Sequence, residues 1–149
     1  MLKRADWSDR VAILGVGLGT LAAYLPWYGY SATTTQVSVN GFRASIMGDL
    51  FFLAIAATAL LVLMRHGLIA DVLGGRVSDR AARLAIAGVA AVAVLIQLVL
   101  IATGGRSASG GMLCAVAAVA ALCAAGWMRG VDVEPRRTVR EMLGEGLPQ

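Results

Sequence analysis

The chain has 149 residues, of which 58% are hydrophobic and 15% are charged, and its mean hydropathy is +0.75. Soluble domains carry about 25% charged residues, so this composition excludes an ordinary soluble domain and indicates one membrane-embedded domain. The net charge of +4 does not point to nucleic acid, because the basic residues lie in short clusters between apolar runs.

Four apolar segments are long enough to cross a bilayer as helices, which takes about 17 to 25 residues each. They predict an all-α membrane protein over residues 1–149, a four-helix transmembrane bundle with spans at 11–28, 46–64, 84–103 and 111–128 and a cytoplasmic tail at 129–149. We do not expect the first segment to be a cleaved signal peptide, because its apolar run exceeds the roughly 7 to 15 residues of such a region.

The basic residues predict the orientation of these spans. Eleven of the 13 lysines and arginines fall on one side of the predicted membrane, in the N-terminal flank, the second loop and the tail. Arg43 and Arg106 fall on the other side. Positively charged loops stay in the cytoplasm, so we expect both termini on the cytoplasmic side of a bacterial inner membrane.

The first span carries a row of small residues, Gly15, Gly19 and Ala23, spaced four apart. Residues at this spacing share one helix face, and small side chains there let two helices approach closely. The row predicts a packing face, either inside this bundle or against another subunit. A nucleotide-binding interpretation fails, because the glycines do not fit G-x-G-x-x-G and no strand precedes them.

A different pattern follows the first span. Residues 28–32 and 36–40 contain strand-forming side chains, with Val37 and Val39 alternating against polar neighbours, and Asn40–Gly41 is a turn signal. Pro26 ends the regular helix early. We therefore predict a short extracytoplasmic β-hairpin that lies on the bundle and forms a structured cap.

Aromatic residues crowd this outer end of the predicted bundle. They form either an interfacial belt at headgroup depth or a recognition surface for a partner or an amphipathic ligand. The candidate recognition surface consists of Tyr24, Trp27, Tyr28, Tyr30 and Phe42, together with Asp49.

Few polar groups lie inside the predicted spans. Asp49, near the start of the second span, fits a helix-capping role, with ion coupling or a pair with Arg43 as alternatives. Gln97, in the third span, fits an interhelical hydrogen bond, with a polar point in an outward-facing cavity as the alternative.

The remaining segments carry weaker signals. Ser78 or Asp79 should cap the third long helix, and the loop GGRSASGG should be a flexible connector. Residues 135–143 could form a short amphipathic helix on anionic headgroups, or remain solvated.

No catalytic or metal-binding pattern is present in the sequence. His66 is the single histidine and has no cysteine or carboxylate cluster beside it in sequence. Cys114 and Cys123 are nine residues apart, which places them too far apart on one helix to form a disulfide. We expect no enzyme activity, no metal and no cofactor.

The motif Leu25-Pro26-Trp27-Tyr28 resembles one in small four-span membrane proteins of high-GC actinobacteria, which carry LPW or LPWY at the outer end of span one. The Ala, Gly, Val and Arg usage and the single lysine fit such a source. The resemblance implies the span layout and carries no function. The layout is also similar to claudin-like proteins, but their paired extracellular cysteines are missing, so their role is not transferred.

These features favour a non-enzymatic membrane protein that acts by protein–protein interaction, as an accessory or assembly subunit or as a self-associating envelope component. Its expected partners are membrane lipid and another protein, or a second copy bound through the small-residue helix faces, and not nucleic acid. The alternative function is a small transporter, a channel or a lipid- or amphiphile-binding protein.

Overall fold

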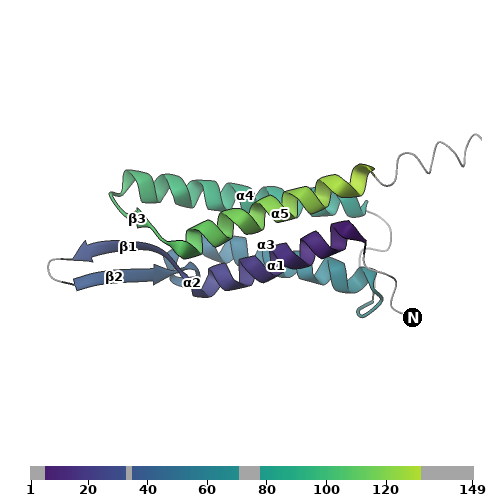
Figure 1. Cartoon of the computed structure of the whole chain (residues 1–149), viewed down its shortest axis with the longest axis horizontal. Coiled ribbons are helices and arrows are strands. Elements are labelled where there is room, and N and C mark those ends of the chain that lie inside the picture. Colours follow the sequence, from purple (N-terminus) through teal and green to yellow (C-terminus); the bar gives the residue numbers. More distant parts are fainter. Residues whose placement is uncertain (1–5, 33–34, 71–77, 132–149) are drawn as a thin grey trace, which may run out of the picture.

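The computed structural model of the chain describes residues 6–32, 35–70 and 78–131. Four long helices lie side by side: α1 (Trp7–Tyr24), α3 (Ile46–Arg65), α4 (Asp79–Thr103) and α5 (Gly110–Val131). Helix α1 packs against α3 and α5, and α4 packs against the same two helices, so the four close into a bundle. A small sheet stands at one end of it (Figure 1).

Helices α3, α4 and the Gly110–Met128 part of α5 are long and apolar enough to cross a membrane. Among the described helices, α1 does not meet the same criterion of length and composition. It starts at Trp7, so its first turn includes Ser8, Asp9 and Arg10. The sequence had placed this span at residues 11–28, four residues later at each end.

Helix α1 ends at Tyr24 because of the proline that follows. Pro26 disfavours helical backbone angles at the residue before it, and Leu25 accordingly adopts an extended conformation with φ −75° and ψ 153°. The chain then continues directly into a strand, so residues 26–28 belong to the sheet and not to the helix.

The predicted hairpin forms, but it projects from the end of the bundle and does not lie on it (Figure 1). Strands β1 (Pro26–Ala32) and β2 (Thr35–Asn40) pair antiparallel, with Tyr28 opposite Val39 and Tyr30 opposite Val37. A third strand, β3 (Ser107–Ala108), pairs with the other edge of β1 and gives the order β2-β1-β3. Part of the loop GGRSASGG, predicted as a flexible connector, is therefore a strand.

Short capping segments join the sheet to the helices. Asn40 caps the one-turn helix α2 (Gly41–Ala44) by accepting a hydrogen bond from the Arg43 backbone, so Asn40–Gly41 begins a helix in place of the predicted turn. Ser45 caps α3, and Ser78 caps α4 as predicted. The amphipathic tail helix predicted at residues 135–143 lies outside the described residues.

The interior of the bundle is built mainly from small side chains. Alanines of α1, α4 and α5 are almost fully buried, among them Ala22, Ala90, Ala115 and Ala118. Phe51 and Ile55 of α3 are among the larger side chains of the same core. Small residues allow close helix approach, which is how membrane helices gain packing energy without a hydrophobic driving force.

Candidate functional site

A buried ion-pair cluster lies at the end of the bundle where α1 begins. Its centre is the carboxylate of Asp9, whose side chain is 1% exposed. Arg83 of α4 donates to Asp9 Oδ1 from Nη2 at 2.8 Å, and Arg65 of α3 donates to the same oxygen from Nη1 at 3.0 Å. One carboxylate therefore holds two guanidinium groups from two other helices.

Further polar contacts surround this pair. Arg83 Nε donates to Asp79 at 3.3 Å, and Arg65 Nη2 forms an ion pair with Asp6 at 2.6 Å. Ser8 donates from Oγ to the carbonyl oxygen of Ala125 at 2.8 Å, which ties α1 to α5. The cluster thus reaches all four long helices.

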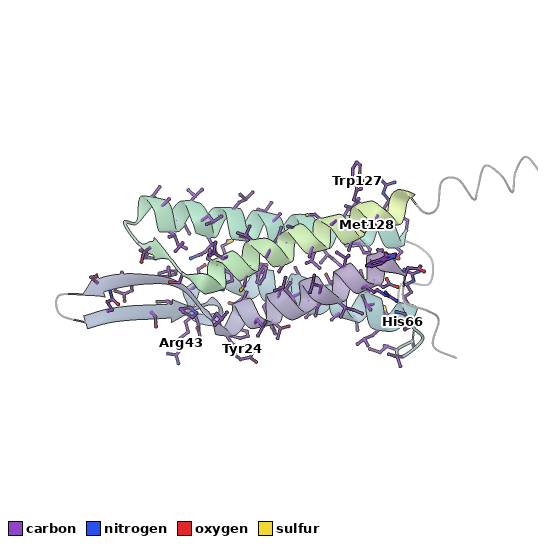
Figure 2. The ribbon with its side chains drawn as sticks, in the orientation of Figure 1. Tyr24, Arg43, His66, Trp127 and Met128 are labelled. Carbon is purple, nitrogen blue, oxygen red and sulfur yellow. The ribbon has the colours of Figure 1, made fainter. Side chains whose placement is uncertain are left out.

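His66, at the end of α3, lies beside the same carboxylate. Its Nε2 is 3.6 Å from Asp9 Oδ2, whereas its buried Nδ1 has no hydrogen-bond partner among the described residues. Figure 2 shows His66 at the end of the bundle opposite Tyr24 and Arg43. No group of three or more His, Cys, Asp or Glu side chains in the described ranges could hold a metal ion.

The sequence did not reveal this cluster. Arg83 and Arg65 are 74 and 56 residues from Asp9, and in the sequence they are recognisable only as basic residues on one side of the predicted membrane. The one available signal was Asp9 itself, an acidic residue among basic ones at the start of an apolar run. Charges buried this deeply are found paired and hydrogen-bonded, as they are here.

At the other end of the bundle, Trp27 anchors the base of the sheet. Its side chain is 0% exposed, its indole Nε1 donates to the carbonyl oxygen of Ala22 at 2.7 Å, and its ring meets Phe51 edge to face at 5.5 Å. A Cβ on Gly41 would lie only 2.7 Å from the same indole nitrogen, so glycine at that position makes room for the ring.

The prediction of an exposed recognition surface is wrong for two of its members. Trp27 and Tyr28 are buried and cannot present themselves to a partner. The reason is a register shift in β1 between Pro26 and Tyr28, which lets neighbouring side chains both face the protein. The Tyr28 ring is also covered by Arg106, whose guanidinium carbon lies 4.8 Å from the ring centroid.

The other four members are exposed. Tyr24 is 69% exposed and its ring meets Phe42 edge to face at 5.5 Å, and Phe42 meets Phe52 at 4.9 Å. Tyr30 is exposed on β1, and Asp49 is exposed in the first turn of α3. We call Tyr24, Phe42 and Phe52 the outer aromatic cluster. Figure 2 shows Tyr24 and Arg43 near the base of the sheet.

The polar candidates inside the helices have simple roles. Gln97 is 1% exposed, and its Oε1 accepts a hydrogen bond from Ser45 Oγ at 2.7 Å, which is an interhelical contact between α4 and the start of α3. Ser45, and not Asp49, caps α3 through a bond from the Met47 backbone N–H. No ion pair joins Asp49 to Arg43, both of which the structure describes.

The small-residue row on α1 is occupied within the chain. Gly15 lies against Leu122 and Ala118 of α5, Gly19 lies against Ile55 of α3, and Ala23 is buried. Cys114 and Cys123 are free thiols.

No family model matches the chain, and no curated protein or solved structure does either.

Proposed function

We propose that all four long helices cross the membrane, including α1. Two of the polar residues that lower the hydropathy of α1, Ser8 and Asp9, are buried in the ion-pair cluster, whereas Arg10 and Thr20 are exposed. The outward side chains of this helix include the apolar residues Ile13, Leu14 and Leu21. Arg10 lies over the Trp7 ring at 5.3 Å, an arrangement suited to a helix end at headgroup depth.

The distribution of basic residues supports one orientation of this bundle. The ion-pair cluster lies at the end that the positive-inside rule assigns to the cytoplasm. The sheet and the outer aromatic cluster lie at the opposite end and would face the outside of a bacterial inner membrane. Both termini would then be cytoplasmic.

We infer that the protein acts by binding another protein, as an accessory subunit or a self-associating envelope component, and not as an enzyme. The observation that carries this inference is the projecting sheet, whose tip extends past the ends of the helices (Figure 1). Buried Trp27 and the β3 pairing hold its base, while no described strand pairs with the outer edge of β2. Rigidly supported surface elements are favourable binding surfaces because little ordering entropy is lost on contact.

The exposed side chains at this end fit protein recognition. Tyr24, Tyr30 and Phe42 are large aromatic side chains on a supported surface, and aromatic residues are enriched in the cores of protein interfaces. The unpaired edge of β2 adds backbone donors and acceptors that an extended segment could use.

Two of the residues that suggested a transporter or channel have other positions or partners in the structure. Gln97 is buried and hydrogen-bonded to Ser45, and Asp49 is exposed on α3. Neither marks a polar path between the described helices.

Site-specific photo-crosslinking in native membranes tests the interaction directly. A photoreactive amino acid at Tyr30 should give a discrete protein adduct, while the same group at Trp127, an exposed aromatic at the opposite end, should give none. Phe42→Ala should reduce the Tyr30 adduct without changing the melting temperature appreciably. Equal adducts at both positions, or none at Tyr30, would contradict the proposal.

A further inference from the structure

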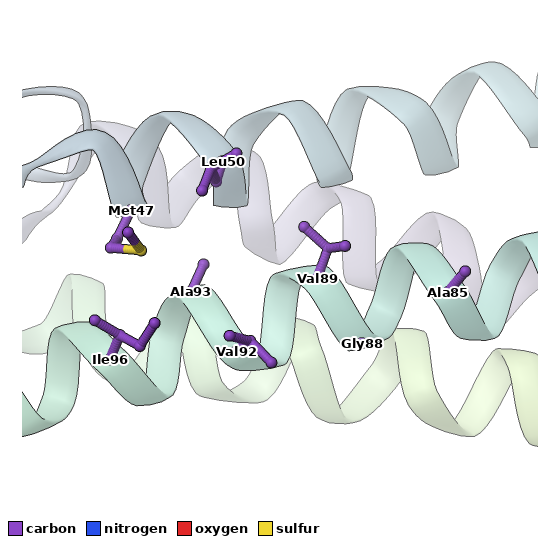
Figure 3. A pocket seen from close by; sticks show the side chains of 8 residues that line it. All are labelled: Met47, Leu50, Ala85, Gly88, Val89, Val92, Ala93 and Ile96. Atoms are coloured by element: carbon purple, nitrogen blue, oxygen red, sulfur yellow. The ribbon is translucent and has the colours of Figure 1, made fainter.

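The outer edge of β2 differs from the apolar surfaces of the bundle because it offers backbone hydrogen-bonding groups. The groove between α3 and α4, for comparison, is lined by side chains such as Met47, Leu50 and Val92 (Figure 3). The backbone groups behind those side chains are bonded within each helix, so the groove does not select one kind of apolar partner. A strand edge, in contrast, is complementary to another extended backbone.

The backbone groups of Gln36 and Ser38 face this open edge. The Gly29 carbonyl oxygen accepts a hydrogen bond from Ser107 Oγ at 3.3 Å, so the backbone groups of Gly29 face β3. The Val37 carbonyl oxygen lies 3.5 Å from the position of a Cβ on Gly29, and it therefore points toward β1. Residues along an antiparallel strand alternate between those that bond to the neighbouring strand and those that do not. The N–H and C=O groups of Gln36 and Ser38 therefore face away from β1.

None of the six residues of β2 blocks this edge. Edge strands of natural proteins usually carry lysine or other charges, a proline or a bulge that prevents pairing with another chain. Residues 35–40 read TQVSVN and contain neither a charge nor a proline. The register shift of the hairpin lies in β1, between Pro26 and Tyr28, and not in β2. Because Gln36 and Ser38 are also exposed, the edge is available to an added strand.

The direction of β2 excludes a symmetric second copy at this edge. The strand runs along the long axis of the bundle, from the tip of the sheet toward the helices (Figure 1). In the proposed placement, β2 therefore runs toward the membrane in every copy. A two-fold axis along the membrane normal would place each edge N–H opposite the same N–H of the other copy, and each C=O opposite the same C=O. A ladder needs donors opposite acceptors, so this pairing cannot form.

The two faces of the hairpin define the side chains that suit an added strand. Tyr30 and Val37 are paired across β1 and β2 on one face, where Tyr30 is 43% exposed and Val37 is half-buried. Gln36 and Ser38 lie on the opposite face and are exposed. An added strand continues both faces, and its side chains contact those of the neighbouring strand on the same face. Apolar residues beside Val37 and polar residues beside Gln36 and Ser38 therefore fit.

We infer that the outer edge of β2 binds an extended segment of a different protein, which adds a fourth strand to the three-stranded sheet. The segment alternates apolar and polar residues, and its backbone bonds to Gln36 and Ser38. This inference rests on the proposed function of protein binding outside the membrane and names the mode of contact. At this surface it selects an accessory role over self-association.

Proline substitutions on the two edges of the hairpin test the inference in the full chain. Proline is tolerated in a strand where the N–H that it lacks would have faced solvent. Ser38→Pro therefore removes an outward N–H from β2 and keeps the bonds to β1. Ser31→Pro is the matched control, because Ser31 faces outward on the opposite edge of β1 and lies beyond the residues that pair with β3. The readout is the protein adduct of a photoreactive amino acid at Gln36, formed in native membranes.

We expect Ser38→Pro to lower the yield of the Gln36 adduct about tenfold, because a ladder hydrogen bond is lost and the proline ring obstructs the added strand. Ser31→Pro should leave the yield unchanged, and both variants should keep the wild-type melting temperature. Val37→Pro removes an N–H that faces β1, so it should lower the melting temperature. An adduct that Ser38→Pro leaves unchanged would overturn the inference. A melting temperature of Ser38→Pro as low as that of Val37→Pro would overturn the assignment of Ser38 to the open edge.

Mass spectrometry of the adducts separates the remaining outcomes. An adduct at Tyr30 without one at Gln36 would leave protein binding intact and would overturn the β2 edge as its site. A Gln36 adduct with a second copy of this chain would also overturn the inference, because that copy cannot pair symmetrically there. An absence of adducts at both positions would refute the proposed function, and the inference with it.

Discussion

Removal of the Asp9 carboxylate should be the most destabilising single change at the ion-pair end of the bundle. Asp9 accepts from Arg83 at 2.8 Å and from Arg65 at 3.0 Å, and its side chain is 1% exposed. Asp9→Ala leaves the guanidinium of Arg83, itself 2% exposed, without its closest carboxylate. Breaking a buried pair by removing one partner costs about 3 to 5 kcal/mol.

Removal of the Arg83 side chain should lower the free energy of unfolding by less than removal of the Asp9 carboxylate does. In Arg83→Met the carboxylate of Asp9 keeps its bond to Arg65, and methionine fills much of the arginine volume. The double variant Asp9→Ala/Arg83→Met no longer buries an arginine that has lost its closest carboxylate. Its loss of stability should therefore fall short of the sum of the single losses by about 1 to 3 kcal/mol.

The free energy of unfolding, measured by SDS titration in mixed micelles, gives all three values. Arg10→Met is the matched control, because Arg10 lies in the same first turn of α1 but is exposed over the Trp7 ring. It should change the unfolding free energy by less than about 0.5 kcal/mol. Losses from Asp9→Ala and Arg83→Met that simply add, or an Asp9→Ala variant as stable as the wild type, would refute the account of the cluster.

Two further predictions concern the sheet end. Gly48→Ala should destabilise the protein by about 1 to 3 kcal/mol, because an added Cβ would collide with the Gly41 carbonyl oxygen. Gly17→Ala, in open space, should be neutral or stabilising, and equal melting temperatures for the two variants would contradict the packing at Gly48. Trp27→Ala should lower the free energy of unfolding by about 3 to 5 kcal/mol, because it empties the pocket that holds the base of the sheet. It should also raise the rate of amide exchange across residues 36–40. An unchanged exchange rate there would show that Trp27 does not support the sheet.

Much of this architecture could be predicted from local pattern. The hairpin follows from alternation around Val37 and Val39, and the cap of α4 follows from Ser78 before an apolar run. The three apolar helices follow from length and hydropathy. Each of these depends on neighbours in sequence, which is why sequence reasoning finds them.

The features that could not be predicted from the sequence depend on residues that are distant along the chain. A tryptophan at the end of a predicted span is typical of an interfacial anchor. A register shift in β1 and the space beside Gly41 instead place the Trp27 side chain in the core. Strand β3 has no strand-forming residues, and its conformation is set by pairing with β1. Asp9 and Arg83 lie 74 residues apart, so only the packing of α1 against its neighbours makes them partners.

The proposed membrane orientation requires that α1 crosses the membrane and that the sheet lies outside. Single cysteines replacing Trp7, Ser38 and Ser78, in a background lacking Cys114 and Cys123, test this with a membrane-impermeant thiol reagent in intact cells. All three native side chains are exposed in the folded protein. In the proposed orientation Ser38→Cys reacts at once, while Trp7→Cys and Ser78→Cys react only after permeabilisation. Reaction of Trp7→Cys in intact cells would show that α1 does not cross, and reaction of Ser78→Cys there would contradict the orientation of the whole bundle.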